Sequence, residues 1–310
     1  MAVIRPATLA DAEAWAEIVT SSAAYHVFGA DTFEWSFHHG SPAALRVVLT
    51  QDDTVMGVAD FFPEQGSGVV HVGVTIHPNH RGRGLGTILW DWHQERISSL
   101  SLDFLQAQVI VNDDVASRAA AARWGFWELK RAEYSMVDPR SVVHHDASPS
   151  TVQVVPLLDL DPGDVWRALV SADDGRDITG LSGIPSFEGF LFDHWEHPDG
   201  RLDLAHAVLV RDRIATVTFL DVVGDRAISR ATSTVPALRN RGFAALSKER
   251  TLMAAAQAGV TRAYAGSHVE NVSMRAVNAR LGYTPVASPT VQRRSVDRRA
   301  RWRRILLPRG

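Results

Sequence analysis

The pattern of apolar and polar positions predicts the same order of elements in each half of the chain. In the first half, apolar residues at helical spacing follow Asp11, and Val-rich stretches broken by polar turns come next. A Gly-rich loop, a helix, a strand and an Ala-rich helix complete the order, which predicts an α/β fold with a mixed sheet, built twice. The elements are expected at residues 8–19, 45–50, 55–62, 69–76, 87–98, 104–111 and 115–124, with counterparts at 205–210, 214–222, 227–235, 244–258, 262–266 and 272–281.

Short sequence matches support two copies of one domain. Arg81-Gly82-Arg83-Gly84-Leu85-Gly86 returns 158 residues later as Arg239-Asn240-Arg241-Gly242-Phe243-Ala244, and Trp124-Gly125-Phe126 returns 157 residues later as Leu281-Gly282-Tyr283. Pro6 and Trp15 match Pro156 and Trp166 in the same order. A polar, proline-flanked stretch separates the copies. We therefore expect an N-terminal domain at 1–138, a linker at 139–151 and a C-terminal domain at 152–310.

The net charge is −3, from 32 Lys and Arg against 35 Asp and Glu, but the charge is unevenly distributed. Eight arginines and one aspartate between Arg293 and Arg309 carry +7, so the rest of the chain carries −3 − 7 = −10. An acidic body argues against generic nucleic-acid binding, because phosphate contacts need clustered cations. The run from Arg301 to Leu307 predicts instead a last strand with an exposed basic face.

Composition removes several other classes of protein. Cysteine is absent, which excludes disulfides, thiolate metal sites and a cysteine nucleophile. The first residues lack the apolar core of a signal peptide, and no apolar run is long enough to span a bilayer. We therefore expect a cytoplasmic protein without membrane contact. No pair of histidines stands at ligand spacing beside a carboxylate, so we expect no metal site. The oligomeric state stays open, a homodimer included.

The strand at 69–76 leads into the Gly-rich run 81–86 and then into a helix. Glycines let the main chain turn so that successive N–H groups converge, and a helix N-terminus adds unpaired donors. This arrangement favours an anion the size of a phosphate, and Arg81 and Arg83 add positive charge. An ordinary strand-to-helix turn is the alternative.

The two Gly-rich runs resemble the signature of the GCN5-related N-acetyltransferase (GNAT) superfamily, which is Arg or Gln, two residues, Gly, one residue, and Gly or Ala. The matching residues are Arg81, Gly84 and Gly86 in the first copy and Arg239, Gly242 and Ala244 in the second. A further feature of the family is an Asn eleven residues before a Gly-Phe pair, which Asn271 resembles, while Asp114 stands there in the first copy. The double arrangement resembles mycothiol synthase and other actinobacterial tandem acetyltransferases.

The resemblance implies two tandem GNAT-like acyl-CoA N-acyltransferase domains that use acetyl-CoA as donor and an amine of a small molecule or short peptide as acceptor. It also implies that the CoA pyrophosphate lies on main-chain N–H groups of the loop, from Arg83 to Thr87, and that the pantetheine arm pairs with the preceding strand. The residues so assigned to CoA are Val74, Ile76, Arg81, Gly82, Arg83, Gly84, Leu85, Gly86 and Thr87, and in the second copy Thr234, Val235, Arg239, Arg241, Gly242, Phe243, Ala244 and Asn271.

An alkylammonium must lose a proton before it attacks a thioester, so a base or a base-linked water is expected. Many members of the resembled family carry a Glu ten residues before the signature. His71 stands there in the first copy and Ser229 in the second. His71 can relay a proton near neutrality and is the expected base, with Asp60 and Glu64 as the next candidates. A strand histidine that only hydrogen-bonds a neighbour is the structural alternative.

The Tyr that often protonates the departing thiolate in this family has no counterpart, because Ala121 and Asn278 occupy its two positions. Asn278 can still donate a hydrogen bond there. The local residues favour acetyl transfer in the first domain, with the second domain as an auxiliary CoA site, whereas the resemblance implies that tandem relatives can use the second domain for chemistry and keep the first as a structural partner. The sequence leaves two alternatives open: an acyl-CoA-binding regulatory or scaffold module, and an acyltransferase that uses a longer acyl chain.

Overall fold

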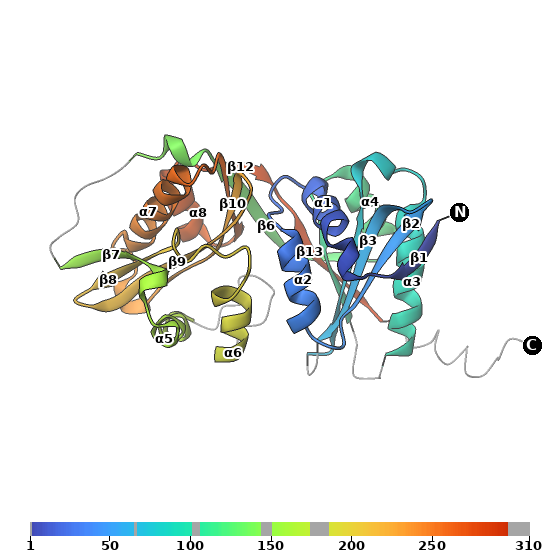
Figure 1. The fold of residues 1–310 in the computed structure, drawn as a ribbon, viewed down its shortest axis with the longest axis horizontal. Helices are drawn as coiled ribbons and strands as arrows, with labels where there is room; N and C mark the ends of the chain where they lie inside the picture. The colour runs from blue at the N-terminus through green and yellow to red at the C-terminus, as the bar shows by residue number, and fades with distance from the viewer. Residues whose placement is uncertain (1, 65–66, 101–105, 144–150, 174–185, 297–310) are drawn as a thin grey trace, which may run out of the picture. The chain divides into compact units, whose positions relative to one another are not determined.

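The computed structural model describes residues 2–64, 67–100, 106–143, 151–173 and 186–296. The chain divides into two compact units. Unit 1 consists of Met1–Arg131 and Pro289–Gly310, and unit 2 consists of Ala132–Ser288. Each unit contains a mixed sheet with helices on both faces (Figure 1), so the α/β fold predicted from the sequence is confirmed.

In unit 1 the strands lie in the order β1-β2-β3-β4-β5-β13-β6. Every neighbouring pair is antiparallel except β4 and β5, which are parallel. The strands are β1 (Val3–Pro6), β2 (Leu45–Gln51), β3 (Thr54–Glu64), β4 (Val69–Ile76), β5 (Gln106–Val111), β13 (Thr290–Ser295) and β6 (Trp127–Val137), of which residues 127–131 belong to unit 1.

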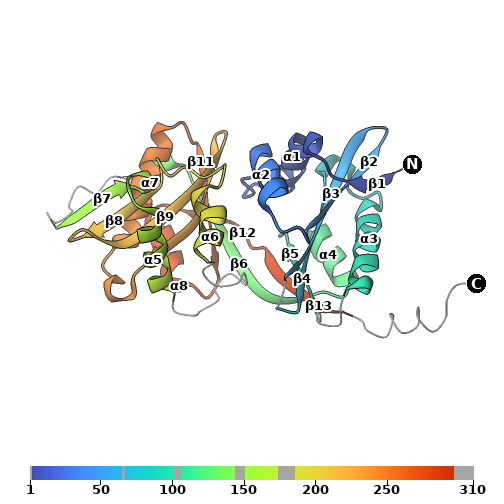
Figure 2. The same cartoon turned by 60° about the horizontal axis from the view of Figure 1, so that its bottom comes forward.

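Two pairs of helices cover the two faces of this sheet (Figure 2). Trp15 and Phe33, on α1 and α2, pack over Val58 on one face, whereas Leu89 and Trp90 of α3 belong to the core on the other face. Successive side chains of a strand point to opposite faces, so one strand contributes to both cores. The helices are α1 (Ala12–Ser22), α2 (Ala30–His39), α3 (Leu85–Ser99) and α4 (Val115–Arg123), with short 3-10 turns η1 (Leu9–Asp11) and η2 (Pro78–His80).

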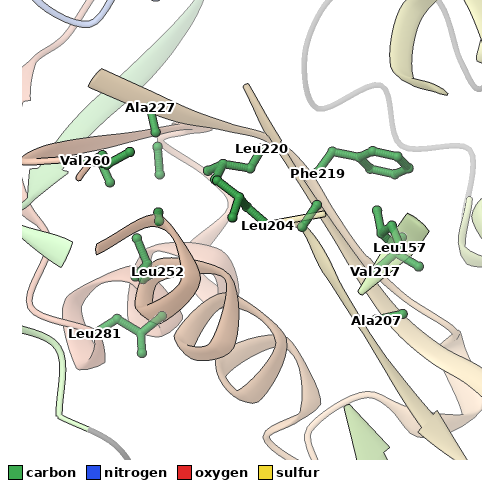
Figure 3. Close-up of a cluster of buried hydrophobic side chains, with 14 of the residues drawn as sticks. Leu157, Leu204, Ala207, Val217, Phe219, Leu220, Ala227, Leu252, Val260 and Leu281 are labelled. Atoms are coloured by element: carbon green, nitrogen blue, oxygen red, sulfur yellow. The ribbon is translucent and has the colours of Figure 1, made fainter. Parts of the chain in front are cut away.

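Unit 2 has the same plan. Its strands lie in the order β6-β11-β10-β9-β8-β7, with β12 beside β6, and among these pairs only β10 and β11 are parallel. Figure 3 shows Phe219 and Leu220 on opposite sides of β9, with Leu252 projecting from α7. The strands are β7 (Val152–Pro156), β8 (His206–Val210), β9 (Arg213–Val223), β10 (Arg226–Thr234), β11 (Arg262–His268) and β12 (Thr284–Ala287).

The helices of unit 2 fall into an early group and a late group along the chain. The early group lies before β8 and the late group follows β10, as in unit 1. The elements are η3 (Pro139–Ser141), η4 (Leu157–Asp159), α5 (Pro162–Ala172), α6 (Phe187–Phe190), the π-helical turn η5 (Leu191–Trp195), η6 (Pro236–Leu238), α7 (Phe243–Gln257) and α8 (Val272–Arg280).

The ends of the two sequence repeats are exchanged between the units. Strand β6 starts in unit 1, but its residues 132–137 pair with β11 and β12 of unit 2. Strand β13 returns from the end of the second repeat and lies between β5 and β6 of unit 1. The units therefore differ from the expected division into 1–138 and 152–310. Both repeats have the same strand pattern, so the sequence does not say which sheet each final strand joins.

The remaining expectations mostly agree with the structure. The expected helices and strands are present, with ends displaced by a few residues. The sequence reading missed α2, whose stretch Asp31-Thr32-Phe33-Glu34-Trp35 shows no clear helical stripe, and it placed no strand at β1, β6, β7, β12 or β13. The basic strand expected from Arg301 to Leu307 lies outside the described residues.

The position of β13 gives a stability prediction. Val291 pairs with Ile110 of β5 and Lys130 of β6. Proline there removes a main-chain donor from a strand that is paired on both sides, so Val291→Pro should destabilise unit 1 by about 3 kcal/mol. Val291→Ala keeps the N–H and should cost roughly 1 kcal/mol. Hydrogen exchange should show the loss of protection in β5 and in residues 127–131. A loss confined to β10 and β11 would contradict the assignment of β13 to unit 1.

Candidate functional site

The Gly-rich loop of unit 1 presents main-chain donors at the start of α3. Gly82 and Gly84 have φ of +77° and +79°, the left-handed region that glycine adopts without strain. A Cβ built on either glycine would meet no described atom within 4 Å, so the space above the loop is open. Leu85 and Gly86 are in the first turn of α3, where N–H groups have no helical acceptor. The loop therefore has the form of an anion site.

One expected donor is not available. The Thr87 N–H donates to the Gly84 carbonyl oxygen at 3.0 Å, because the first turn of α3 closes on the loop glycine. The prediction that Thr87 helps to surround a pyrophosphate is therefore wrong for its N–H group. The N–H groups of Arg83, Gly84, Leu85 and Gly86 keep no main-chain acceptor in the described structure.

The loop of unit 2 has the same local geometry. Asn240 and Gly242 have φ of +61° and +82°, so Asn240 adopts the left-handed conformation that Gly82 adopts in unit 1. Asparagine tolerates this region better than most residues. The Arg239 Nε donates to the Thr234 carbonyl at 3.1 Å, just as the Arg81 Nε donates to the Ile76 carbonyl at 3.2 Å. The Arg239 guanidinium makes a further hydrogen bond, in which its Nη2 donates to the Ala172 carbonyl oxygen at 2.7 Å.

In both units the strand before the loop separates from its parallel neighbour. Strand β4 pairs with β5 only from Val69 to His71, although it continues to Ile76. The His77 N–H donates to Met56, and the alternation of an antiparallel ladder then directs the main-chain groups of Val74 and Ile76 away from β3. They face the side on which β5 no longer pairs. An extended amide-bearing chain can hydrogen-bond there.

The corresponding positions in unit 2 are Thr232 and Thr234. Strand β10 pairs with β11 only from Arg226 to Ser229. The Val235 N–H donates to the Ala215 carbonyl at 2.9 Å, so it faces β9 and cannot serve a ligand on the other side. Thr234 can therefore pair with a pantetheine arm, as expected. The N–H group of Val235 cannot, and that expectation is wrong, because the main-chain groups that face the ligand side belong to the residue before it. Adjacent residues of a strand point their main-chain groups to opposite neighbours.

His71 lies where β4 and β5 separate, and a hydrogen-bonded network holds it. Its Nε2 lies 3.1 Å from a Glu64 oxygen, and its Nδ1 lies 3.5 Å from the Gln108 side-chain nitrogen. Arg293 of β13 donates its Nε to the Gln108 oxygen at 2.8 Å, which turns the Gln108 nitrogen toward His71. This orientation assigns the proton to Nε2, where Glu64 accepts it, and leaves the lone pair on Nδ1. About a quarter of the His71 side chain, 26%, is exposed.

Asp60 lies on the same face of the sheet, opposite Gly73. A Cβ at Gly73 would overlap the Asp60 carboxylate and lie 2.7 Å from its Cγ, so only glycine leaves room for this side chain. Asp60 is reached by solvent but is surrounded by protein, and this environment raises the pKa of its carboxyl group, opposed by Arg46 and His71.

A buried histidine supports β4 from the opposite face. The His93 Nε2 donates to the Gly73 carbonyl at 2.9 Å, and the ring is fully buried. Burial lowers the pKa of His93 from 6.5 to about 4, because the charged imidazolium would lose its hydration. His93 is therefore neutral at pH 7.

Unit 2 differs from unit 1 at the point where His71 would lie. The pairing of β10 with β9 shifts between Ser229 and Ala231, which leaves Arg230 as an extra residue. Ser229 is buried, and burial raises the pKa of the nearby Tyr283 hydroxyl. A bulge of this kind changes the direction of the residues beside it. Ser229 is therefore not a functional counterpart of His71.

The same bulge brings together a charged cluster that the sequence reading missed. Arg230 lies 3.3 Å from Asp221, and the His197 Nδ1 lies 3.8 Å from the same Asp221 oxygen. Burial raises the pKa of Asp221 to about 6 and lowers the pKa of His197 to about 3. In the sequence, this cluster is indicated only by His194 and His197, which stand among acidic residues.

Two polar helix residues of the sequence prediction have clear structural positions. The Asn271 Oδ1 accepts the Met274 N–H at 3.1 Å and caps α8, and Asp114 caps α4 in the same way through Ser117 at 2.9 Å. Helix capping therefore accounts for both side chains. Asn278 of α8 is buried, and its Oδ1 has no hydrogen-bond partner among the described residues.

The described residues contain one sizeable cavity beside a Gly-rich loop, and it lies in unit 2. It has a volume of about 440 Å³ and is lined by Arg241, Gly242 and Phe243 at the start of α7 and by Arg280 at the end of α8.

No group of three or more metal-ligating side chains occurs in the described part of the chain. No helix within the described ranges is long and apolar enough to cross a membrane.

Comparison with known proteins agrees with this geometry. Residues 12–126 match the Acetyltransferase (GNAT) family, a range that lies within unit 1. No curated protein matches the sequence.

Solved structures resemble the whole chain. A GCN5-related N-acetyltransferase from Sphaerobacter thermophilus is 15% identical over 95% of this chain and 96% of that chain, with a TM-score of 0.69. A tandem GNAT protein from the clavulanic acid biosynthesis pathway is 18% identical over 96% of this chain and 99% of that chain, with a TM-score of 0.74. An acetyltransferase from the GNAT family of Colwellia psychrerythraea is 14% identical over 95% of this chain and 100% of that chain, with a TM-score of 0.57. At these identities the likeness shows the fold, which is that of tandem GNAT proteins.

The loop geometry predicts how CoA affinity responds to substitution. Gly84→Val places a β-branched residue in the left-handed region and a side chain in the open space above the loop. We expect a loss of CoA affinity of at least tenfold by calorimetry. Gly82→Asn copies the residue that unit 2 already has at this place, so its affinity should stay within about threefold of the original. Equal affinity of the Gly84→Val protein, still folded, would exclude this loop as a CoA site.

Buried His93 predicts a pH-dependent stability of unit 1. Between pH 6.5 and 4 the unfolded chain binds a proton at this residue and the folded chain does not, so acid favours unfolding. The contribution lost over this interval is about 3 kcal/mol. In the His93→Gln protein, the side-chain amide can still donate a hydrogen bond to the Gly73 carbonyl, but it does not titrate. In denaturation followed by tryptophan fluorescence, the stability difference between the two proteins should therefore change between pH 7 and pH 4.5. A constant difference would show that His93 titrates normally.

Proposed function

We propose that this chain, whose residues 12–126 belong to the acetyltransferase (GNAT) family and whose fold is that of tandem GNAT proteins, transfers an acetyl group from acetyl-CoA to an amine of a small molecule or short peptide. The observation that carries the proposal lies in unit 1. There an open loop of N–H donors, a strand edge without a partner and a solvent-accessible histidine follow one another along β4 and into α3.

The chain's own groups suit the parts of acetyl-CoA. The pyrophosphate would accept hydrogen bonds from the N–H groups of Arg83 to Gly86, with charge from Arg81. The amides of the pantetheine arm would pair with Val74 and Ile76, whose main-chain groups face away from β3. A ligand that follows this edge toward His71 brings its thioester to the place where β4 and β5 join. The open space above Gly84 accommodates such a close approach.

The reaction requires one proton acceptor. The amine nitrogen attacks the thioester carbonyl, the C–N bond forms, the C–S bond breaks, and CoA leaves as a thiolate that takes a proton from solvent. The Nδ1 of His71, left unprotonated because Glu64 accepts from Nε2, would take the proton from the amine, directly or through a water, in place of its long 3.5 Å contact with the Gln108 side-chain nitrogen. Glu64 then stabilises the imidazolium.

Unit 2 has the same fold as unit 1, but its residues favour a different function. Its loop has the geometry of the unit 1 loop, but Ser229 is buried beside a bulge and, as a serine, does not act as a base near neutrality, so it cannot take the part of His71. This observation supports the alternative function, an acyl-CoA-binding module, for unit 2 alone. Unit 2 also has a titratable group, Asp221, near the bulge, so we test by substitution which unit catalyses the reaction.

Matched variants in the two units test the assignment. His71→Gln should lower kcat by about 10²- to 10⁴-fold with acetyl-CoA and an accepted amine, because a positioned base contributes that much. Ser229→Ala changes the corresponding position of unit 2 and should leave kcat within about twofold. The release of free CoA measures both. If Gly242→Val abolishes turnover while His71→Gln keeps its rate and pH profile, catalysis belongs to unit 2.

A further inference from the structure

Three strands of unit 1 bring two opposite charges to one place beside His71. Arg46 of β2 lies opposite Asp60 of β3, and Asp60 lies opposite Gly73 of β4. Gly73 and His71 are two residues apart on β4, so they share a face of the sheet. The missing side chain at Gly73 makes the niche that the Asp60 carboxylate occupies. The row Arg46–Asp60–Gly73 therefore ends next to the proposed base.

Both charges in this row lack a partner of their own. Neither Arg46 nor Asp60 lies within 4.0 Å of an oppositely charged side chain among the described residues, and no side chain there hydrogen-bonds to either of them, although the Asp60 carboxylate interacts with its own main chain. Arg46 is half-buried, and burial lowers its pKa, which shows that its charge is poorly solvated. Its guanidinium approaches the end of α2, 3.5 Å from where a Cβ on Gly40 would be. A partly desolvated cation with no anion favours an anionic ligand.

Direct cross-strand neighbours of opposite charge usually have their Cβ atoms about 5 Å apart and can pair. Here they do not pair, although the electrostatic influence of Arg46 reaches Asp60. The guanidinium extends toward Gly40 and the carboxylate toward Gly73, so the two charged groups stay apart on neighbouring strands, each with unused hydrogen-bonding capacity. A ligand with an ammonium and a carboxylate on neighbouring atoms can satisfy both.

We propose that the acceptor is an α-amino acid or a compound with the same amine and carboxylate, with its ammonium on Asp60 and its carboxylate on Arg46. This inference rests on the proposed acetyl transfer in unit 1 and specifies the acceptor for it. The ammonium on Asp60 would lie on the face of the sheet that carries His71, which takes its proton before attack. The carboxylate of the acceptor stays bound to the guanidinium and does not react, so Arg46 determines specificity.

Matched acceptor pairs test the proposal. Purified full-length protein is assayed for CoA release with acetyl-CoA and a set of amino acids, each compared with its own amide, which keeps the amine but has no carboxylate. The original protein should favour the acids in kcat/KM. Arg46→Gln should reduce the ratio of acid to amide by about 10- to 100-fold, since a hydrogen bond to a charged group is lost. Arg46→Lys should recover part of that ratio. Arg213→Gln, an exposed arginine at the start of β9, is the control and should leave the ratio unchanged.

A binding measurement separates this proposal from the proposed function. Thermal stabilisation of the protein by the acids, absent with the amides and lost in Arg46→Gln, supports the anion site whether or not turnover is seen. Stabilisation without any CoA release overturns acetyl transfer but not the site. Equal preference for acids and amides, or an Arg46→Gln protein with an unchanged ratio and unchanged binding, overturns the proposal.

Discussion

The insertion of β13 between β5 and β6 is the interaction on which the candidate site of unit 1 depends. It completes the sheet, and it also brings Arg293 to Gln108. Gln108 is buried and could present either end of its amide to His71. The guanidinium accepts no hydrogen bond, so it fixes the amide oxygen on its own side and the nitrogen on the side of His71. Arg293, from the last part of the described chain, thereby orients the Gln108 amide that contacts His71.

The two units show how one backbone plan can support different chemistry. Both loops combine left-handed residues, an arginine bonded to the preceding strand, and a helix that begins at the same place. They differ in one extra residue, Arg230, in the strand before the loop. A one-residue insertion in a strand reverses the direction of the side chains beside it. Unit 1 has an accessible histidine where its strands separate, whereas unit 2 has a buried serine and, nearby, the Asp221–Arg230 pair.

The acceptor side of unit 1 also depends on local backbone choices. Gly73 makes room for the Asp60 carboxylate on one face, and its carbonyl accepts a hydrogen bond from His93 on the other. Each buried polar group there has a cost that only a specific partner offsets. His93 has its partner in the main chain. Arg46 and Asp60 have no side-chain partner among the described residues, which is the basis of the proposed acceptor site.

The sequence alone predicted the repeat and most of the helices and strands within it, because these depend on residues close together in the chain. Hydrophobic periodicity fixes helices and strands locally, and the spacing of Arg81, Gly84 and Gly86 fixes an anion-binding turn. The spacing of His71 from the loop also identified the residue where the strands separate. Those inferences needed no knowledge of which segments pair.

Only the tertiary structure decided which strand completes which sheet and which side chains meet at the site. The final strands of the two repeats have the same alternating pattern, so either could fill either sheet, and pairing across the chain made the choice. Gln108 and Arg293 are 185 residues apart in the chain. The bulge at Arg230 is visible only through its partner strand. Contacts of this kind depend on three-dimensional neighbours, and short-range patterns carry no information about them.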